Sequence, residues 1–119
     1  MLNTTKQTHW TEIFRTQKGV VYQSDRERCL WLEFRGQKEA YKIKDFKKLK
    51  QQIEKINLAE MASNASLAFD LEIIYPPAQE HCWVLTLCEI VQIKALLEGA
   101  WVMLELNSIL NERLYPLSV

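Results

Sequence analysis

Hydrophobic and polar residues alternate over much of the first 44 residues, and this alternation predicts a series of short strands. The segments HWTEIFRT and VVYQS are rich in β-branched and aromatic residues and flank a turn at QKG. In CLWLEF, Leu30, Leu32 and Phe34 share one side of the chain. The turns DRER and RGQKE separate these segments from each other and from AYKIK. We therefore expect four strands joined by short turns.

From Asp45 the apolar residues recur every three or four positions, which predicts a helix. Asp45 is a suitable N-cap, because its side chain can accept a backbone N–H of the first turn. The apolar stripe is narrow and consists of Phe46, Leu49, Ile53 and Ile56. Lysine and glutamine cover the rest of this helix, which is expected to end near ASNAS.

Alternation returns in LAFDLEIIY, which predicts a half-buried strand. Its apolar side would hold Leu67, Phe69, Leu71 and Ile73. Pro76 and Pro77 end this strand, and HCWVLTL is the next one. A second helix is expected from about Glu89 to Arg113, with Pro116 beyond its end.

The second half of the chain resembles the first at an offset of 44 residues, so that Tyr41 matches Leu85 and Asp45 matches Glu89. Each half contains a strand pair that runs into a helix. The predicted fold class is therefore α+β, with an antiparallel sheet of five or six strands, two long helices on one face, and two pseudo-repeated ββα halves. Chance periodicity is the alternative, because any strand–helix unit resembles another.

The second helix is apolar over more than one side. One set of apolar residues fills about half of its circumference and includes Ile93, Leu97 and Ala100. A thin charged stripe contains Lys94, Glu98, Glu105 and Glu112. Beyond this stripe lie further apolar residues, namely Val91, Val102, Leu106 and Ile109. A single sheet face cannot cover both sets, and a helix that is apolar nearly all round is buried in a core or at an interface.

The surplus of apolar residues predicts association. We expect a non-enzymatic protein–protein interaction module that homodimerises through its apolar C-terminal helix, or that binds another protein. The candidate residues, some for the core and some for the interface, are Trp101, Met103, Leu106 and Ile109. The alternative is that the N-terminal hairpin covers the surplus side and completes a monomeric core.

Length and composition indicate one globular domain spanning residues 1–119, with residues 1–8 as a flexible tail. The net charge is zero, but residues 35–55 carry eight basic and three acidic side chains. This uneven charge supports a second hypothesis, nucleic-acid binding through the basic face of residues 42–55. The lysines concerned are Lys42, Lys44, Lys47, Lys48, Lys50 and Lys55. A solvated surface is the simpler explanation.

The sequence offers little catalytic or metal-binding chemistry. It contains no Gly-rich phosphate loop, HExxH motif or nucleophile elbow. The cysteines lack the paired spacing of a zinc site, so we expect no metal and no cofactor. An enzyme hypothesis would require a deep pocket lined by His81 or a cysteine.

Location is inferred from what the chain lacks. The most apolar window, around residues 82–104, is interrupted by Glu89, Lys94 and Glu98, so we expect no membrane-spanning segment. The N-terminus does not have the basic and apolar regions of a signal peptide, and the three cysteines are an odd number. A cytoplasmic location is therefore expected.

The segments CLWLEF, DFKKLKQQIEKI and LCEIVQIKALLEGAWVMLELNSIL together resemble small uncharacterised bacterial proteins of Bacteroidota. The resemblance covers roughly residues 20–112 and consists mostly of hydrophobic pattern. Some of these relatives carry a Cys-x-x-Cys pair near the second strand. Here only Cys29 stands in that region, and Leu32 occupies the position of its partner. The resemblance implies a small cytoplasmic domain and no particular activity.

Overall fold

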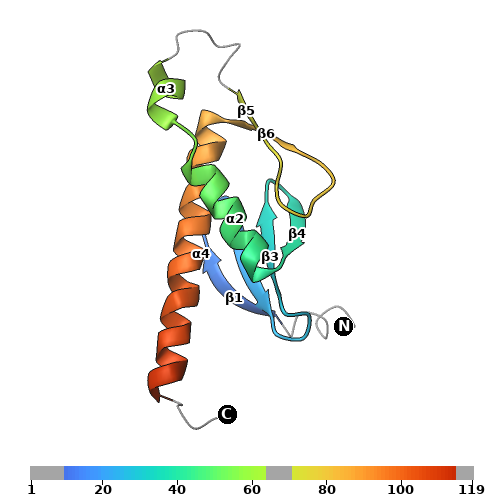
Figure 1. Cartoon of the computed structure of the whole chain (residues 1–119), viewed down its shortest axis with the longest axis vertical. Coiled ribbons are helices and arrows are strands. Elements are labelled where there is room, and N and C mark those ends of the chain that lie inside the picture. Colours follow the sequence, from blue (N-terminus) through green and yellow to red (C-terminus); the bar gives the residue numbers. More distant parts are fainter. Residues whose placement is uncertain (1–9, 64–70, 115–119) are drawn as a thin grey trace.

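The computed structural model describes residues 10–63 and 71–114, with side chains described as far as Ser108 in the last helix. The predicted tail at residues 1–8 lies outside the described residues, as do Leu67 and Phe69. The described elements form an α+β fold, in which two long helices and a small second sheet pack on one face of a larger sheet (Figure 1).

The larger sheet is an antiparallel meander of four strands in chain order. Its strands are β1 (Trp10–Arg15), β2 (Gly19–Ser24), β3 (Cys29–Phe34) and β4 (Gln37–Tyr41). The first three lie in the segments that alternation predicts. β4 begins three residues before the expected strand AYKIK, so residues 37–39 of the predicted turn RGQKE belong to the strand and Ile43 and Lys44 belong to the helix that follows. Between β3 and β4 the chain reverses through Arg35 and Gly36, whose φ angles are 57° and 76°. Two consecutive positive φ angles are typical of the tight hairpin turns that match the twist of the strands.

Gly19, the last residue of the QKG turn, begins β2, and a side chain at this position would meet a steric obstacle. A Cβ at this position would lie 2.5 Å from the carbonyl oxygen of Glu33 and 2.8 Å from Cδ2 of Leu96. Glycine therefore allows the last helix to approach the sheet closely.

The first long helix, α2, covers Ile43–Glu54 and begins two residues earlier than predicted. Lys42, not Asp45, occupies the N-cap, and it makes no side-chain capping bond. Asp45 lies in the first turn instead, where its negative charge complements the helix dipole. A separate short helix, α3 (Leu58–Ser63), follows, and Asn57 Oδ1 caps it by accepting the backbone N–H of Glu60 at 2.9 Å.

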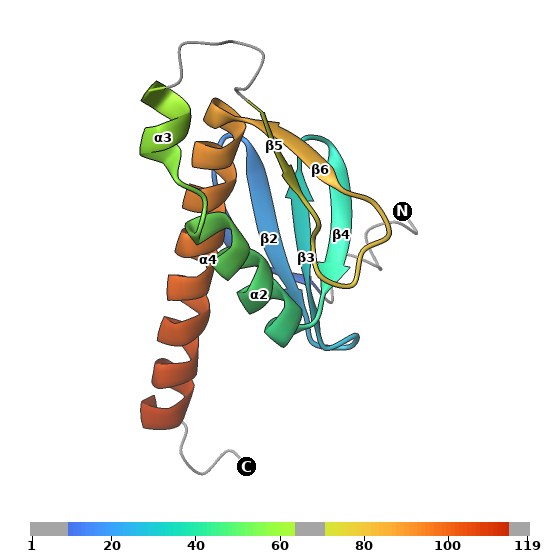
Figure 2. The same cartoon turned by 45° about the horizontal axis from the view of Figure 1, so that its top comes forward.

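The remaining strands, β5 (Leu71–Ile74) and β6 (Trp83–Thr86), form a separate two-stranded antiparallel sheet. The prediction of one sheet is therefore wrong, because the described residues form two sheets, one of four strands and one of two. The small sheet packs over the same face as the helices, where Trp83 lies 6.3 Å from Phe34 between ring centroids (Figure 2). Side chains join the two sheets: Arg35 donates to the carbonyl of Val84, and Gln79 donates to that of Ala40.

The predicted orientation of β5 is wrong. Leu71 and Ile73 were expected to be buried, but they are 51% and 54% exposed, whereas Ile74 is buried. Cross-strand partners share a face, and Ile74 pairs with Trp83. The large Trp83 ring enters the core and therefore takes Ile74 inward with it, so Leu71 and Ile73 face outward.

The last helix, α4, covers Leu87–Leu114 and follows β6 without a loop. Thr86 and Glu89 form a capping box, in which each side chain accepts the backbone N–H of the other residue, at 2.9 and 3.2 Å. The helix has 28 residues and is therefore about 42 Å long. It packs on the sheet beside α2 as far as Trp101, Met103 and Leu104, and its last turns extend beyond the sheet (Figures 1 and 2).

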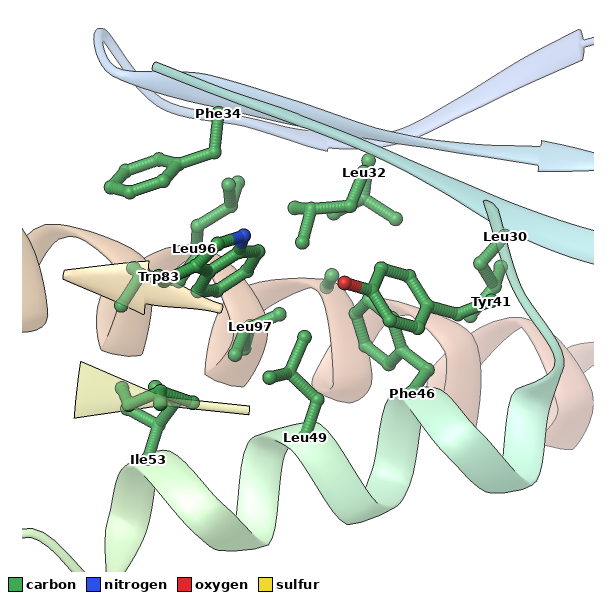
Figure 3. Close-up of a cluster of buried hydrophobic side chains, with 14 of the residues drawn as sticks. Leu30, Leu32, Phe34, Tyr41, Phe46, Leu49, Ile53, Trp83, Leu96 and Leu97 are labelled. Carbon is green, nitrogen blue, oxygen red and sulfur yellow. The ribbon is translucent and has the colours of Figure 1, made fainter. Parts of the chain in front are cut away.

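The core lies between the four-stranded sheet and the layer formed by α2, α4 and β6 (Figure 3). The sheet contributes Leu30, Leu32 and Phe34 from β3, which share one side as predicted. The helices contribute apolar residues of comparable size, including Phe46, Leu49, Ile53, Ile93, Leu96 and Leu97. This single cluster determines which side of each helix is buried and which side remains free.

Candidate interaction surfaces

The free side of α4 carries an apolar stripe, which we call the outer stripe and define as Val91, Ala95, Val102 and Leu106. The exposed fractions of Val91, Val102 and Leu106 are 50%, 60% and 44%, and Ala95 is also exposed. The buried residues of the same helix, among them Ile93 and Ala100, lie on the opposite side. The helical projection predicted Val91, Val102 and Leu106 on a water-facing side, and this prediction is confirmed.

The four interface candidates occupy different environments. Trp101 is half-buried and stacks on Phe46, with ring centroids 6.3 Å apart and an interplanar angle of 15°. Met103 is half-buried and packs against the core cluster. Leu106 is exposed on the outer stripe. The side chain of Ile109 lies outside the described residues.

The N-terminal hairpin covers a neighbouring side of α4, not the outer stripe. Its strand β1 packs against the helix at Gly99, where an added Cβ would overlap the ring of Phe14. The hairpin therefore covers part of α4, as the alternative hypothesis expected, but it leaves the outer stripe exposed. Val102 remains the most exposed of the three large stripe residues although β1 lies close by.

The small sheet has an apolar outer face of its own. Ile73 pairs with Val84 across the two strands, and both side chains are exposed. Leu71 and Tyr75 are exposed beside them. The alternating pattern of LAFDLEIIY indicated a strand, but the pattern alone assigned this face to the core.

The basic face of α2 is largely open to solvent. Lys44, Lys47, Lys48 and Lys55 are exposed, and helical geometry places them opposite the buried Phe46. Lys42 is exposed just before the helix. Lys50 differs from the others, because it is half-buried and its Nζ lies 2.7 Å from Oε2 of Glu54.

Aromatic side chains gather on the side of the four-stranded sheet that faces away from the helices. Trp10 stacks on Trp31 with ring centroids 5.2 Å apart, and Tyr22 lies 5.5 Å from Trp10. Lys38 Nζ lies 5.5 Å from the Trp10 ring centroid, a geometry typical of a cation–π interaction. The three rings are half-buried, and such cross-strand contacts stabilise the open face of a sheet.

A polar cluster connects β4 to the segment that precedes β6. Glu39 is only 8% exposed, and its Oε1 accepts a hydrogen bond from the hydroxyl of Tyr41 at 2.6 Å. Its other oxygen, Oε2, contacts Nε2 of the exposed His81. Burial and the hydrogen bond to Glu39 raise the pKa of the Tyr41 phenol. The cluster therefore fixes the β5–β6 connection against the larger sheet.

His81 lines a hollow of about 660 Å³ together with Trp31, Gln37, Lys38, Glu39, Ala40 and Gln79. An enzyme hypothesis required a deep pocket lined by His81 or a cysteine. This hollow is a broad surface depression and not a deep cleft, although a carboxylate-paired imidazole is a common element of acid–base sites. The sequence pattern does not indicate this cluster, because Glu39 and His81 are far apart in the chain.

The three cysteines are free thiols, and two of them, Cys82 and Cys88, are exposed. Burial, with a smaller contribution from Glu27, raises the pKa of the half-buried Cys29 thiol. Within residues 10–63 and 71–114, no three His, Cys, Asp or Glu side chains gather closely enough to hold a metal ion. In the same residues no helix has the length and apolar character needed to cross a membrane.

No protein-family model, curated protein or solved structure matches this chain. The resemblance to small proteins of Bacteroidota therefore stays a prediction. The exposed surfaces of the protein therefore provide the evidence on its function.

Proposed function

We propose that this protein is a non-enzymatic protein–protein interaction module that homodimerises through α4. The observation that carries the proposal is the outer stripe, which exposes Val91, Val102 and Leu106 on a helix that projects beyond its own fold. A helix in a protein gains most of its stability from tertiary packing, and the last turns of α4 extend beyond the sheet of their own fold. A second copy would supply the missing surface.

The size of the stripe indicates how strong the dimer should be. Completing the burial of a half-exposed valine or leucine contributes about 1 kcal/mol, so six such side chains in a dimer contribute about 6 kcal/mol. Association itself costs at least about 4 kcal/mol in lost freedom of motion. The stripe alone therefore leaves at most about 2 kcal/mol, which corresponds to a dissociation constant of tens of millimolar. A measurable dimer requires further contacts beside the stripe.

Light scattering over a wide range of protein concentrations tests the proposal. We expect the mean mass to rise from 14.0 kDa towards twice that value. The double variant Val102→Glu/Leu106→Glu should remain monomeric and folded, because charges cannot be buried in an apolar interface without a large cost. The matched control is Ile73→Glu, at a similarly exposed position on β5, which should still dimerise. A mass of 14.0 kDa at every concentration would contradict the proposal.

The alternative proposal is nucleic-acid binding through the basic face of α2. It is supported by the side-by-side exposure of Lys44, Lys47, Lys48 and Lys55 on the helix surface opposite the core. Binding to a mixed pool of RNA or DNA should then fall steeply with salt, because each phosphate contact releases a counterion. Lys47→Glu/Lys48→Glu should abolish the binding, whereas Lys18→Glu on the β1–β2 turn should not. No binding at low salt would end this alternative.

We also propose that the two ββα halves are a true repeat. The order of strand pair and helix occurs as β3–β4–α2 and again as β5–β6–α4. Superposition of residues 27–54 on residues 71–98 tests this idea. Strand pairs that fail to superpose when the helices are aligned would count against it.

A further inference from the structure

We propose that α4 pairs with α4 of a second copy in antiparallel orientation, about a two-fold axis that passes beside Glu98 and Gly99. This inference rests on the proposed function and adds to it the orientation and register of the interface. Four observations support it, and they concern spacing, side-chain size, charge and the position of α4 in the fold.

The spacing of the outer stripe is the same in both directions along the helix. From Val91 the next stripe residues follow at intervals of four, seven and four positions, ending at Leu106. A two-fold axis at the midpoint, between residues 98 and 99, therefore places Val91 opposite Leu106 of the second copy and Ala95 opposite Val102. A two-fold interface requires this self-complementarity, because the same residues contact each other twice.

Side-chain sizes agree with this register. Ala95 is the smallest residue of the stripe, and Val102, opposite it, is the most exposed of the large ones. A small residue facing a larger one lets two helices approach closely while their surfaces remain in contact. Val91 and Leu106 would close the interface at its two ends.

The charges beside the stripe also agree. Lys94 and Glu105 lie on the same flank of α4, and the two-fold axis brings Lys94 of each copy within about 3 Å, along the helix axis, of Glu105 of the other. An antiparallel two-fold pair brings the same flanks together, whereas a parallel pair would place them on opposite sides of the interface and remove this contact between opposite charges. Glu98 lies closest to the axis and faces its own counterpart. It is the one residue that works against the proposed pair.

The position of α4 in the fold makes the pair sterically open. The buried side of α4 faces the sheet, α2 lies along one flank, and β1 packs at Gly99 on the other. The outer stripe points away from the sheet and from α2, and β1 borders it at Gly99. A partner helix can therefore lie along the stripe on the flank away from Gly99, which is the flank of Lys94, Glu98 and Glu105. In the antiparallel register, the C-terminal half of each α4 lies beside the N-terminal half of the partner helix.

Cysteine pairing tests orientation and register together. In a background of Cys29→Ser, Cys82→Ser and Cys88→Ser, the variants Ala95→Cys and Val102→Cys are oxidised alone and as a mixture. Residues 95 and 102 of one helix are about 10 Å apart along its axis, which exceeds the reach of a disulfide. We therefore expect rapid formation of covalent dimers only in the mixture.

The possible outcomes separate this inference from the proposed function. Covalent dimers from each variant alone would indicate a parallel pair and overturn the inference, while leaving the dimer in place. A dimer seen by light scattering with no cross-link in any sample would overturn it too, because another surface would then hold the copies together. A monomer at all concentrations would overturn both proposals.

A charge exchange provides a second test that does not depend on oxidation. Lys94→Glu and Glu105→Lys should each weaken the dimer roughly tenfold, because two opposite-charge contacts become like-charge contacts. The double exchange should return the dissociation constant to within about threefold of the original value. Glu98→Gln should strengthen the dimer, and Glu80→Gln, away from α4, is the control. Failure of the double exchange to restore binding would contradict the register.

Discussion

The two long helices follow strands in the same way and lie on the same sheet face, yet their surfaces differ. In α2 the buried residues Phe46, Leu49 and Ile53 form one stripe, and lysines occupy the opposite side. In α4 the buried side is matched by a second apolar side at Val91, Val102 and Leu106. The two helices share one core, so the core does not explain the second apolar side of α4. This difference supports the proposal that a partner covers that side.

The ends of the two helices show the same contrast. α2 ends at Glu54, and Asn57 caps the short helix that follows it. α4 continues to Leu114, beyond the region that the sheet covers. Helices in proteins are stabilised mainly by tertiary packing. A long helix whose last turns extend beyond the sheet, and whose free side is apolar, therefore supports the proposal of a partner.

The largest expected effect comes from the core that both helices share. Phe46→Ala removes a completely buried ring from α2 and leaves Trp101 of α4 without its stacking partner. We expect a loss of about 3–5 kcal/mol in the free energy of unfolding, measured by denaturant titration. Leu106→Ala on the outer stripe is the control and should cost less than about 1 kcal/mol in the monomer. Equal losses of unfolding free energy in the two variants would mean that Leu106 is packed in the monomer as well as Phe46 is, which would contradict the contrast between the two sides of α4.

The contact between α4 and β1 should be the next most sensitive feature. Gly99→Ala places a Cβ against the ring of Phe14, which is packed against the core cluster. We expect a loss of about 1–3 kcal/mol, since the ring or the helix has to move. Ser108→Ala, exposed on the same helix, should be nearly neutral. An unchanged unfolding free energy for Gly99→Ala would show that β1 does not pack there.

Tyr41 precedes α2 at the position that Leu85 holds before α4, and it gives the first half a buried polar contact. Tyr41→Phe leaves Oε1 of the buried Glu39 without its donor and should cost about 1–3 kcal/mol near neutral pH. Leu85→Val, a conservative change at the matching position, should cost about 1 kcal/mol. Denaturant titrations of both variants give the comparison. A neutral effect of Tyr41→Phe would mean that Glu39 keeps its partners without the hydroxyl.

The same tyrosine predicts a pH dependence. Its pKa is raised above the ordinary value of 10.0, so the folded state holds the phenol proton more tightly than the unfolded state does. Stability from this group is then fully present below pH 10.0 and is lost as the pH rises further. Tyr41→Phe should flatten the fall in unfolding free energy above this pH. Identical slopes for the two proteins would contradict the assignment.

The smallest expected effect concerns the surface of α2. Lys50→Ala removes the ion pair with Glu54, four residues along the same helix. We expect a loss of about 0.3–0.5 kcal/mol at low salt and almost none at high salt, because exposed pairs are screened. Lys48→Ala, which removes an exposed lysine of the same helix, is the control. A larger loss for Lys50→Ala would assign its aliphatic stem a packing role.

The local elements of this protein could be predicted because they depend on periodicity that neighbouring residues carry. The strand of Leu30, Leu32 and Phe34 and the buried stripe of α2 both follow from spacing along the chain. Trp101 shows where this reasoning stops, because spacing places it in the apolar surplus of α4 without saying what it contacts. Its stacking on Phe46 depends on the angle at which the two helices cross, which spacing does not specify.

The sequence by itself determined most of the strands and both long helices, the α+β class and the excess of apolar residues on α4, but not the separate helix α3 or the start of β4. Only the tertiary structure decided that the described strands divide into two sheets, because that depends on Trp83 packing over the face of the larger sheet. It also decided that Leu71 and Ile73 face outward, and that Glu39 meets His81. The physical reason is the same in each case: alternation specifies that a strand has two sides, but a distant partner determines which side is buried.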